Sequence, residues 1–311
     1  MSEHVPVLLK ETVESLDIRD GKIYVDLTTG RAGHSREILK RIPNGRLICF
    51  DQDQVALEES RPVLEKVGSN FTLVKSNFAN LKQELAKLGI DRVDGILADL
   101  GVSSPQLDEG DRGFSYQHDG KLDMRMDLDN PLTAEKVVNS YSLEDLTRIF
   151  RTYGEDKDAY QVAKAIVKAR EAKRIETTFE LVDIIKSAKS FKTLAKKGHP
   201  AKQIFQALRI EVNHEEEALE ALLRDAPGLL APGGRLAIIT FMSLDDRLVK
   251  LAFRDLAVVE GDRDSIALLP SQIKQSDFAL YSRKPIAPSE EELERNHRAA
   301  SAKLRTLIRK Q

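Results

Sequence analysis

Short apolar runs alternate with helix-like segments through the first hundred residues, and this alternation limits the folds open to the chain. Strands are expected at the apolar runs, residues 23–28, 46–50, 71–75 and 93–98. Helices are expected between them, at residues 35–41, 55–67 and 81–88. Because parallel strands need a crossover connection, usually a helix, this order predicts a parallel α/β sheet.

The alternation stops after residue 98, and residues 135–197 show only helical periodicity. Strand character returns at residues 235–241 and 278–282. The expected fold class is therefore α/β, a doubly wound Rossmann-like sheet with an inserted all-helical domain. The charged tail from residue 289 is expected to be helical.

The domain limits follow from where the alternation stops and resumes. The sheet domain is expected to be discontinuous, at residues 1–107 and 204–311. The inserted helical domain is expected at residues 108–203. Boundaries read from a sequence pattern carry an uncertainty of several residues.

The composition limits the cellular compartment and the kinds of partner that the protein can have. A single cysteine, Cys49, excludes an internal disulfide framework and suits the cytoplasm. The first residues are polar, and no apolar run approaches the roughly 20 residues of a membrane-spanning helix. We therefore expect a cytoplasmic protein with no membrane segment. The net charge of −2 argues against indiscriminate nucleic-acid binding, so any RNA contact must come from a local basic face.

A long polar loop follows the fourth expected strand, which ends at the acid Asp99. Open α/β sheets bind ligands just outside the carboxyl ends of their strands, and long loops in compact domains are usually functional. On polarity alone, a solvated surface loop is the simpler interpretation.

The turn after the first expected strand, residues 26–35 (DLTTGRAGHS), indicates a nucleotide-type cofactor. Its glycines let the backbone approach a ligand, and an acid, Asp51, follows Gly30 by twenty-one residues, as expected for a ribose ligand. This pattern fits an adenosine-containing cofactor and does not separate dinucleotides from S-adenosylmethionine. The missing third glycine and second nucleotide-binding half disfavour a nicotinamide-dependent oxidoreductase, which remains an alternative.

Several longer motifs carry a family resemblance. They are DLGVSSPQLD (99–108), RGFS (112–115), LDMRMD (122–127), HPA (199–201), FQALRIEVNHE (205–215) and NHRAASAKLR (296–305). In this order they resemble the bacterial 16S rRNA (cytosine-N4)-methyltransferases. The resemblance implies S-adenosylmethionine as cofactor, a Rossmann-like methyltransferase domain, and methyl transfer to the exocyclic N4 amine of a cytidine in the decoding region. It also implies 16S rRNA and the small ribosomal subunit as partners.

The resemblance also assigns roles to single residues. Ala32, Gly33 and His34 would line the methionine end of the cofactor, Asp51 would hold the ribose, and Phe78 would flank the adenine. Asp99 and Gln106 would close the site. Taken alone, His34 is better explained as a polar residue at the start of a helix, and Phe78 as a core residue. Because all these residues occur in the order and at the spacing of the family, these simpler explanations become less favoured.

Chemistry suggests one catalytic candidate. A sulfonium methyl group is already electrophilic, so the enzyme mainly has to align the amine and accept its hydrogens as charge develops. Asp99 is the best candidate for this acceptor, with Ser103, Ser104 and backbone carbonyls as other acceptors. The six histidines are scattered, so no metal site is expected.

RNA contact is expected from the insert and its flanking loops. Residues 151–202 hold thirteen Lys or Arg against seven Asp or Glu. The densest run consists of Lys186, Lys189, Lys192, Lys196, Lys197 and Lys202. A solvated helix face explains any single lysine equally well. The residues proposed for RNA are Ser104, Arg112, Lys192, Lys196 and Lys197.

The chain departs from the family pattern at three positions, and two of them, Ala32 and Met242, motivate a further alternative. Ala32 replaces a glycine, Met242 replaces a histidine, and Asp245 replaces a glutamate. A non-catalytic rRNA-binding assembly factor would tolerate these changes. We expect Ala32 to keep a right-handed or extended backbone, whereas a positive φ would favour that alternative. The sequence leaves the oligomeric state open, a homodimer included.

Overall fold

The computed structural model of the chain describes residues 6–195, 198–257 and 276–311. The chain forms two compact units, the first made of Met1–Gly101 with Glu217–Gln311 and the second of Val102–Glu216. The second unit begins six residues earlier and ends thirteen residues later than the predicted helical domain. It therefore includes helix α11 (Lys202–Asn213), which packs on other helices of this unit.

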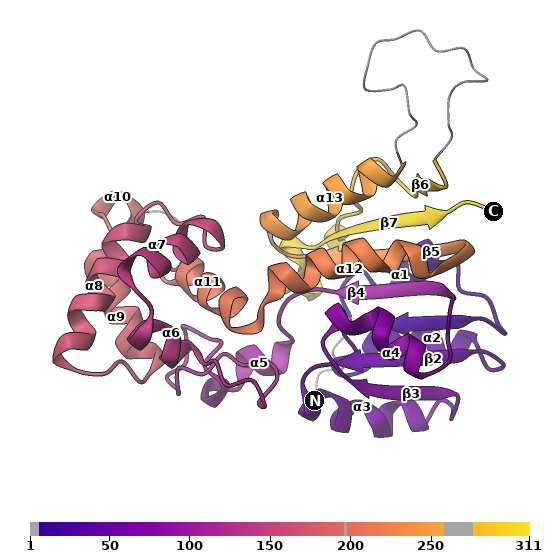
Figure 1. Cartoon of the computed structure of the whole chain (residues 1–311), viewed down its shortest axis with the longest axis horizontal. Helices are drawn as coiled ribbons and strands as arrows, with labels where there is room; N and C mark the ends of the chain where they lie inside the picture. Colours follow the sequence, from indigo (N-terminus) through magenta and orange to yellow (C-terminus); the bar gives the residue numbers. More distant parts are fainter. Residues whose placement is uncertain (1–5, 196–197, 258–275) are drawn as a thin grey trace, which may run out of the picture. The chain divides into compact units, whose positions relative to one another are not determined.

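A seven-stranded sheet forms the centre of the first unit, in the order β3-β2-β1-β4-β5-β7-β6 (Figure 1). Its strands are β1 (Ile23–Asp26), β2 (Arg46–Asp51), β3 (Phe71–Lys75), β4 (Val93–Asp99), β5 (Leu230–Thr240), β6 (Phe278–Leu280) and β7 (Lys303–Arg309). Strands β1 to β5 pair in parallel, so their carboxyl ends share one edge of the sheet. The predicted doubly wound fold class is confirmed.

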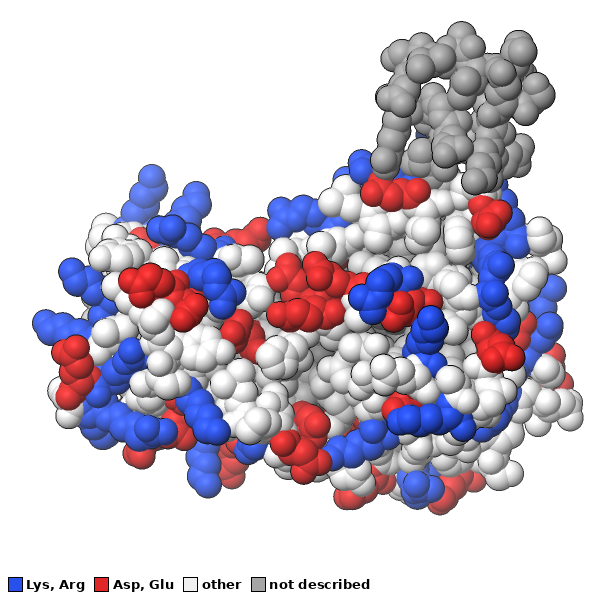
Figure 2. Space-filling model, in the orientation of Figure 1, with Lys and Arg blue, Asp and Glu red and all other residues white. Residues whose placement is uncertain are grey.

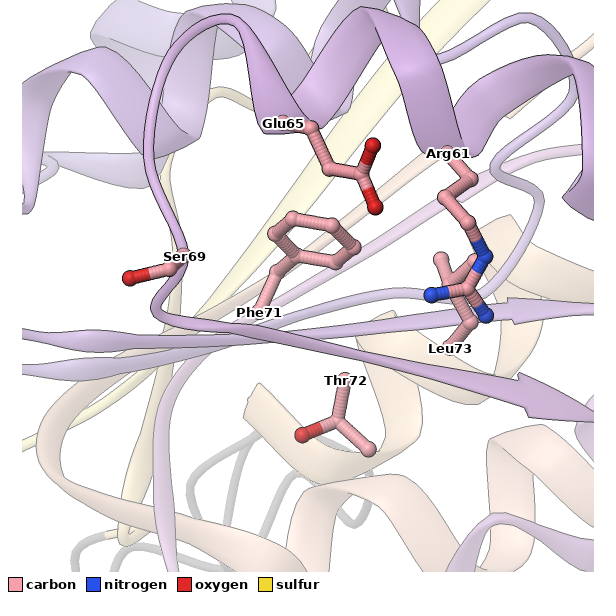
Figure 3. Close-up of a pocket in the computed structure, with 6 residues that line it drawn as sticks. All are labelled: Arg61, Glu65, Ser69, Phe71, Thr72 and Leu73. Atoms are coloured by element: carbon pink, nitrogen blue, oxygen red, sulfur yellow. The ribbon is translucent and has the colours of Figure 1, made fainter.

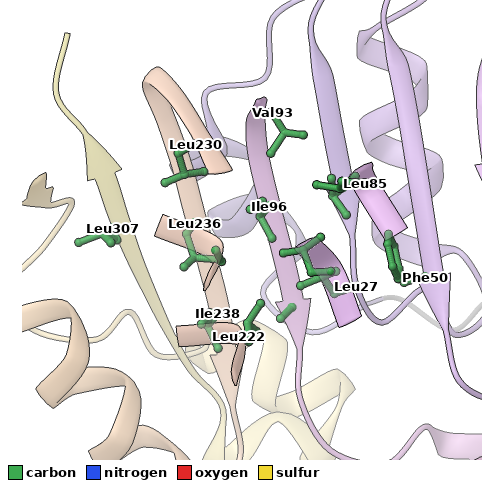
Figure 4. Close-up of a cluster of buried hydrophobic side chains, with 14 of the residues drawn as sticks. Leu27, Phe50, Leu85, Val93, Ile96, Leu222, Leu230, Leu236, Ile238 and Leu307 are labelled. Carbon is green, nitrogen blue, oxygen red and sulfur yellow. The ribbon is translucent and has the colours of Figure 1, made fainter. Parts of the chain in front are cut away.

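Helices cover both faces of the sheet because successive strand residues point to opposite sides. One face is covered by α4 (Leu81–Lys87), α12 (Glu215–Leu229) and α13 (Ser243–Ala257). The other face is covered by α1 (Leu9–Leu16), α2 (Gly33–Arg41) and α3 (Gln54–Glu65). Ile96 of β4 belongs to the first core cluster (Figure 4), and its neighbour Leu97 belongs to the second. Both are fully buried, and each such side chain stabilises the fold by about 1.5–3 kcal/mol.

The charged tail is the main error of the expected secondary structure. It is helical only in α14 (Glu290–Arg295) and a short 3₁₀ turn, and it ends in strand β7. β7 lies between β5 and β6 and is antiparallel to both. Leu304 and Thr306 point into the core while Lys303 and Arg305 reach Asp246. The helix predicted for residues 303–309 is therefore wrong, because these residues pair as a strand with β5 and β6.

The second unit is built from short helices. They are α5 (Ser104–Asp108), α6 (Ala134–Ser140), α7 (Leu143–Thr152), α8 (Ala159–Ala172), α9 (Thr178–Ala188), α10 (Phe191–Leu194) and α11. Helical spacing buries Leu146, Ile149 and Phe150 of α7 on one face, and a capping box between Thr177 and Glu180 begins α9. Among its described residues, β pairing is limited to one isolated bridge.

In the parts of the chain that the structure covers, no helix combines the length and the apolar character needed to cross a membrane.

Candidate active site

The turn between β1 and α2 is held together by a buried carboxylate. Asp26, at the end of β1, accepts a hydrogen bond from the Thr28 amide (3.1 Å) and one from the Ser35 hydroxyl (2.6 Å). Burial raises the pKa of Asp26 to about 6. Since one side chain joins both ends of the turn, Asp26 fixes the shape of the loop that a ligand would meet.

Ala32 has a left-handed backbone, with φ 61° and ψ 26°. Its amide donates to the Thr29 carbonyl (2.7 Å), and its carbonyl accepts from the Arg36 amide (2.8 Å), so both sides of the residue are fixed. The expectation of a right-handed or extended Ala32 is therefore wrong. The turn needs a conformation that suits glycine, and the buried methyl group of Ala32 instead packs in the second core cluster.

The N-terminal segment packs against the next two residues of the turn. A Cβ on Gly33 would lie 2.2 Å from the Pro6 ring, so only glycine fits at this position. His34 is buried, and its Nε2 lies 3.0 Å from the Val7 carbonyl oxygen. Because a carbonyl oxygen only accepts, Nε2 carries the hydrogen. Nδ1 of the same ring lies 3.9 Å from a carboxylate oxygen of Asp99.

Asp51 ends β2 and holds the same turn from the neighbouring strand. One oxygen accepts from the Gly30 amide and the other from the Asp53 amide, each at 2.9 Å. Burial raises the pKa of Asp51 to about 6, against the lowering effect of these bonds. Each carboxylate oxygen accepts two hydrogen bonds, so lone pairs remain for two ligand hydroxyls.

Phe78 begins a 3₁₀ turn directly after β3 and packs partly buried against the first core cluster. Its position is fixed by Asn77, whose side chain accepts from the Ala79 amide and donates to Gln52 beyond β2, each at 2.9 Å. The residues after β2 and β3 are thus joined. Sequence reasoning missed Gln52 and Asn77, although Asn before a turn is a recognisable capping signal.

Asp99 ends β4, and its amide donates to the Thr28 hydroxyl (2.7 Å). Its Oδ1 is buried and has no hydrogen-bond partner among residues 6–195, 198–257 and 276–311. Burial, and then the charge of Asp26, raise the pKa of Asp99 to about 8. A buried acceptor without a partner is costly, so this oxygen fits a ligand that brings a donor.

The strand ends together form an acidic site. Asp26, Asp51 and Asp99 follow β1, β2 and β4, and within the described residues none of the three pairs with Lys or Arg. A cationic ligand with hydroxyl groups suits this arrangement, as S-adenosylmethionine does through its sulfonium, ammonium and ribose groups.

The other predicted site residues lie in the second unit. Gln106 is buried, and its side-chain oxygen accepts from the Ser103 amide (3.0 Å) in the capping box of α5, where Ser104 is the first residue. Arg112 lies over the Phe114 ring (5.8 Å) and donates to the Arg125 carbonyl (3.0 Å). These bonds shape the loop, and the ligand roles of the three residues stay predictions.

The lysines between Lys186 and Lys202, predicted to contact RNA, do not all lie on the surface. Lys192 is exposed on α10, but Lys189 is buried and bonded to the equally buried Asp156. Lys189 is therefore not available to RNA. Lys196 and Lys197 lie outside the described residues. Across the described ranges, no group of three or more potential ligand side chains is gathered as for a metal ion.

The sequence profile of the MraW methylase family matches residues 1–310. The chain belongs to this family. It is 52% identical to "Ribosomal RNA small subunit methyltransferase H" of Finegoldia magna, over 97% of each chain. It is 53% identical to the protein of that name in Streptococcus dysgalactiae subsp. equisimilis, over 97% of this chain and 96% of the other. A solved rRNA methylase from Streptococcus thermophilus is 13% identical, with a TM-score of 0.41 and coverage of 100% and 99%.

Membership confirms the predicted enzyme class, a methyltransferase. The structure shows contacts made by residues of three of the quoted motifs, NHRAASAKLR, FQALRIEVNHE and LDMRMD. Asp246, in the segment that departs from the family pattern at Met242, binds Arg305 and Lys303 of β7 (2.8 and 3.1 Å). Asn213 accepts from the Met126 amide and donates to the Met124 carbonyl, both at 2.8 Å. These motif residues join distant segments within each unit.

A surface pocket lies away from the strand ends that form the acidic site. It is lined by Arg61, Glu65, Ser69, Phe71, Thr72 and Leu73 (Figure 3). Figure 3 shows the Phe71 ring beneath Glu65 of α3, at the beginning of β3. The candidate site instead gathers around the ends of β1, β2 and β4, so this pocket takes no part in it.

Proposed function

We propose that the chain transfers a methyl group from S-adenosylmethionine to the exocyclic N4 amine of a cytidine in 16S rRNA, in the decoding region of the small ribosomal subunit. The observation that carries this proposal is the buried, unpartnered Oδ1 of Asp99 at the end of β4. Family membership and the relatives named as small-subunit rRNA methyltransferases support the substrate.

Each part of the cofactor has a residue suited to it. The cofactor, when bound, supplies an electrophilic methyl group on a positively charged sulfur. Asp51 accepts hydrogen bonds from the ribose hydroxyls through its remaining lone pairs. Phe78 flanks the adenine, and the turn from Gly30 to His34 borders the methionine end. The acidic strand ends favour the cationic sulfur over the neutral thioether that methyl transfer leaves.

Asp99 acts on the amine that receives the methyl group. The lone pair of an exocyclic cytosine amine is delocalised into the ring, which makes it a weak nucleophile. Accepting an N–H hydrogen bond at Oδ1 favours the localised lone pair as charge develops on nitrogen. Oδ2 lies 3.9 Å from Nδ1 of His34. Because the pKa of Asp99 is raised to about 8, methylation should accelerate as the pH rises toward that value.

RNA recognition is assigned to the second unit. Figure 2 shows Lys and Arg side chains spread over its visible surface, with Asp and Glu among them. Lys186, Lys192 and Lys202 are exposed there, and they join Ser104 and Arg112 as proposed contacts. The target base must leave its stack to reach a methyl group, which favours single-stranded or loop RNA. Action on ribosomal subunits also supports a cytoplasmic location.

The test uses small subunits from cells that lack this gene. Purified full-length chain and S-adenosylmethionine should add one methyl group to a decoding-region cytidine, located by mass mapping of fragments. Asp99→Asn should lower kcat with little change in cofactor affinity. Asp91→Asn is the matched control, because Asp91 is exposed just before the opposite end of β4. Wild-type protein that binds the cofactor and leaves every rRNA fragment unmethylated would refute the proposal.

Asp51→Ala tests the cofactor assignment. Loss of hydrogen bonds to two hydroxyls, each worth roughly 1 kcal/mol, should weaken S-adenosylmethionine binding about tenfold or more. Asp51→Asn keeps one oxygen acceptor and should lie between wild type and Asp51→Ala in isothermal titration. Unchanged affinity in a folded Asp51→Ala protein would remove Asp51 from the site.

A further inference from the structure

Three aromatic residues of the second unit form a stack that the proposed function has not used. The rings of Tyr116 and His199 are parallel within 11°, with centroids 4.4 Å apart. Phe205 of α11 meets the Tyr116 ring edge-on, at 5.8 Å and 90°. Phe205 is buried, whereas Tyr116 and His199 are each partly exposed. The stack therefore rests on the core of the unit and reaches its surface.

The backbone fixes the orientation of the histidine ring. The Ala201 amide donates to Nδ1 of His199 (3.2 Å), so the neutral ring carries its hydrogen on Nε2. Burial, and then the charge of Lys186, lower the pKa of His199, which keeps the ring neutral at neutral pH. Nε2 is therefore a donor held in a defined direction.

Both polar ends of the stack lack partners. Neither the Tyr116 hydroxyl nor Nε2 of His199 has a hydrogen-bond partner within the described part of the chain. Tyr and His rings that serve only packing usually bury their ring faces and pair their polar atoms. Here the rings are partly exposed, one hydrogen-bond donor and one hydroxyl remain available, and a lysine lies nearby.

We propose that the Tyr116–His199 stack is a binding platform for an unpaired nucleobase of the small-subunit rRNA. This inference rests on the proposed function for its RNA partner. Proteins recognise single-stranded RNA by stacking its bases on aromatic rings and bonding their edges. The stack supplies the aromatic face, the hydroxyl and Nε2 supply edge contacts, and the exposed Lys186 supplies a positive charge for the adjoining phosphate.

The position of Tyr116 in the chain fits this role. It directly follows Arg112–Ser115, in the segment that leaves the end of β4, where Asp99 lies. His199 begins the segment that leads into α11, whose Lys202 amide donates to the His199 carbonyl (3.1 Å).

The first experiment measures stacking directly. Decoding-region RNA oligonucleotides with 2-aminopurine at successive unpaired positions are titrated with full-length protein; because the chain has no tryptophan, protein fluorescence interferes little. Quenching at one unpaired position is expected, and Tyr116→Leu should abolish it. Absence of quenching at every unpaired position with wild-type protein overturns the proposal, and this result does not depend on any variant folding.

The second experiment separates stacking from folding and from catalysis. Tyr116→Leu should raise the KM for small subunits by about fivefold to 150-fold, the range for loss of one stacked base, while cofactor affinity and kcat stay unchanged. Tyr116→Phe keeps the stack and should retain most of the affinity. Tyr160→Leu is the control, because Tyr160 is an exposed aromatic residue on α8 outside the stack.

The outcomes also separate this inference from the proposed function. If wild-type protein methylates subunits and a folded Tyr116→Leu protein keeps the wild-type KM, the platform is refuted and the enzyme assignment stands. If wild-type protein quenches 2-aminopurine and methylates nothing, the platform stands and the proposed reaction fails.

Discussion

Ala32 carries a backbone conformation that an L-residue disfavours by roughly 1–2 kcal/mol. Ala32→Gly relieves this strain, but it removes a buried methyl group and loosens the unfolded chain. We expect these effects to offset, leaving the free energy of unfolding within about 1 kcal/mol of wild type. Ala32→Val should cost about 2 kcal/mol or more, because a branched side chain suits neither this φ nor the packed site. Denaturant unfolding measures both changes.

The matched control is Ala163, which is fully buried inside the regular helix α8. Ala163→Gly should destabilise by about 1 kcal/mol, since no strain is relieved there. Equal losses at the two alanines would show that the left-handed turn is not strained. Ala32→Gly should also leave methylation intact, whereas higher activity than wild type would favour the view that this alanine impairs the enzyme.

Asp99 makes the stability of the cofactor-free protein depend on pH. Its pKa rises to about 8 in the fold, against about 3.9 in an unfolded chain. A raised carboxyl pKa gives stability that is present below about pH 4 and is lost as the pH rises to about 8. Asp26 and Asp51, each raised to about 6, act in the same direction. Asp99→Asn should therefore raise Tm more at pH 8 than at pH 5.

Melting at these two pH values, with Asp91→Asn as the exposed control, tests the burial of Asp99. An equal shift at both values would mean that the carboxyl group is solvated.

The sequence could predict that Asp51 and Asp99 lie together at one edge of the sheet, because both end apolar strands and the strand ends of a parallel sheet meet at one edge. It could not predict that Pro6 lies against Gly33 or that Nε2 of His34 lies at the Val7 carbonyl. Those contacts join segments 27 residues apart in sequence, and no local pattern encodes such a contact.

At the scale of elements, the lysines around α9 and α10 divide into two groups. Lys189→Met would leave Asp156 as a buried charge without its partner and should destabilise the second unit by about 3–5 kcal/mol. Neutralising the exposed Lys186, Lys192 and Lys202 should leave the melting temperature nearly unchanged. It should instead weaken RNA binding and lower the slope of log affinity against log salt by about 0.7 per lost contact.

Filter binding at several salt concentrations, with circular-dichroism melting of the same variants, separates the two groups. An unaltered salt slope in the triple variant would leave those lysines as a solvated face. Lys189→Met with wild-type stability would contradict the buried pair.

Strands β1 to β4 could be predicted because each is a short apolar run between helical segments. Strand β7 could not, because Glu290–Arg295 and the basic residues after it resemble one continuous charged helix. Its period-two pattern, Leu304 and Thr306 in the core with Lys303 and Arg305 bonded to Asp246, spans too few residues to prevail locally. Pairing with β5 and the contacts with Asp246 decide the conformation, and both are long-range.

For the whole molecule, the division into two units predicts which part of the chain a bound ligand stabilises. Saturating S-adenosylmethionine at one hundred times its Kd stabilises the unit that binds it by about 2.7 kcal/mol. Amide exchange should therefore slow in β1, β2 and β4 and stay unchanged in α7, α8 and α9. Exchange rates measured by mass spectrometry with and without the cofactor test this, and equal slowing in both units would show that they unfold together.

The pairing of β4 with β5 has a consequence for how the protein reaches its fold. Val93 pairs with Leu230, so the two central strands come from either side of the second unit. Closing such a long loop costs more entropy than joining β1, β2 and β3, and pairings of this range form slowly. A helical unit that folds first shortens the flexible part of that loop. Helix-breaking changes in α8, far along the chain from any cofactor residue, should therefore lower the yield of protein able to bind S-adenosylmethionine.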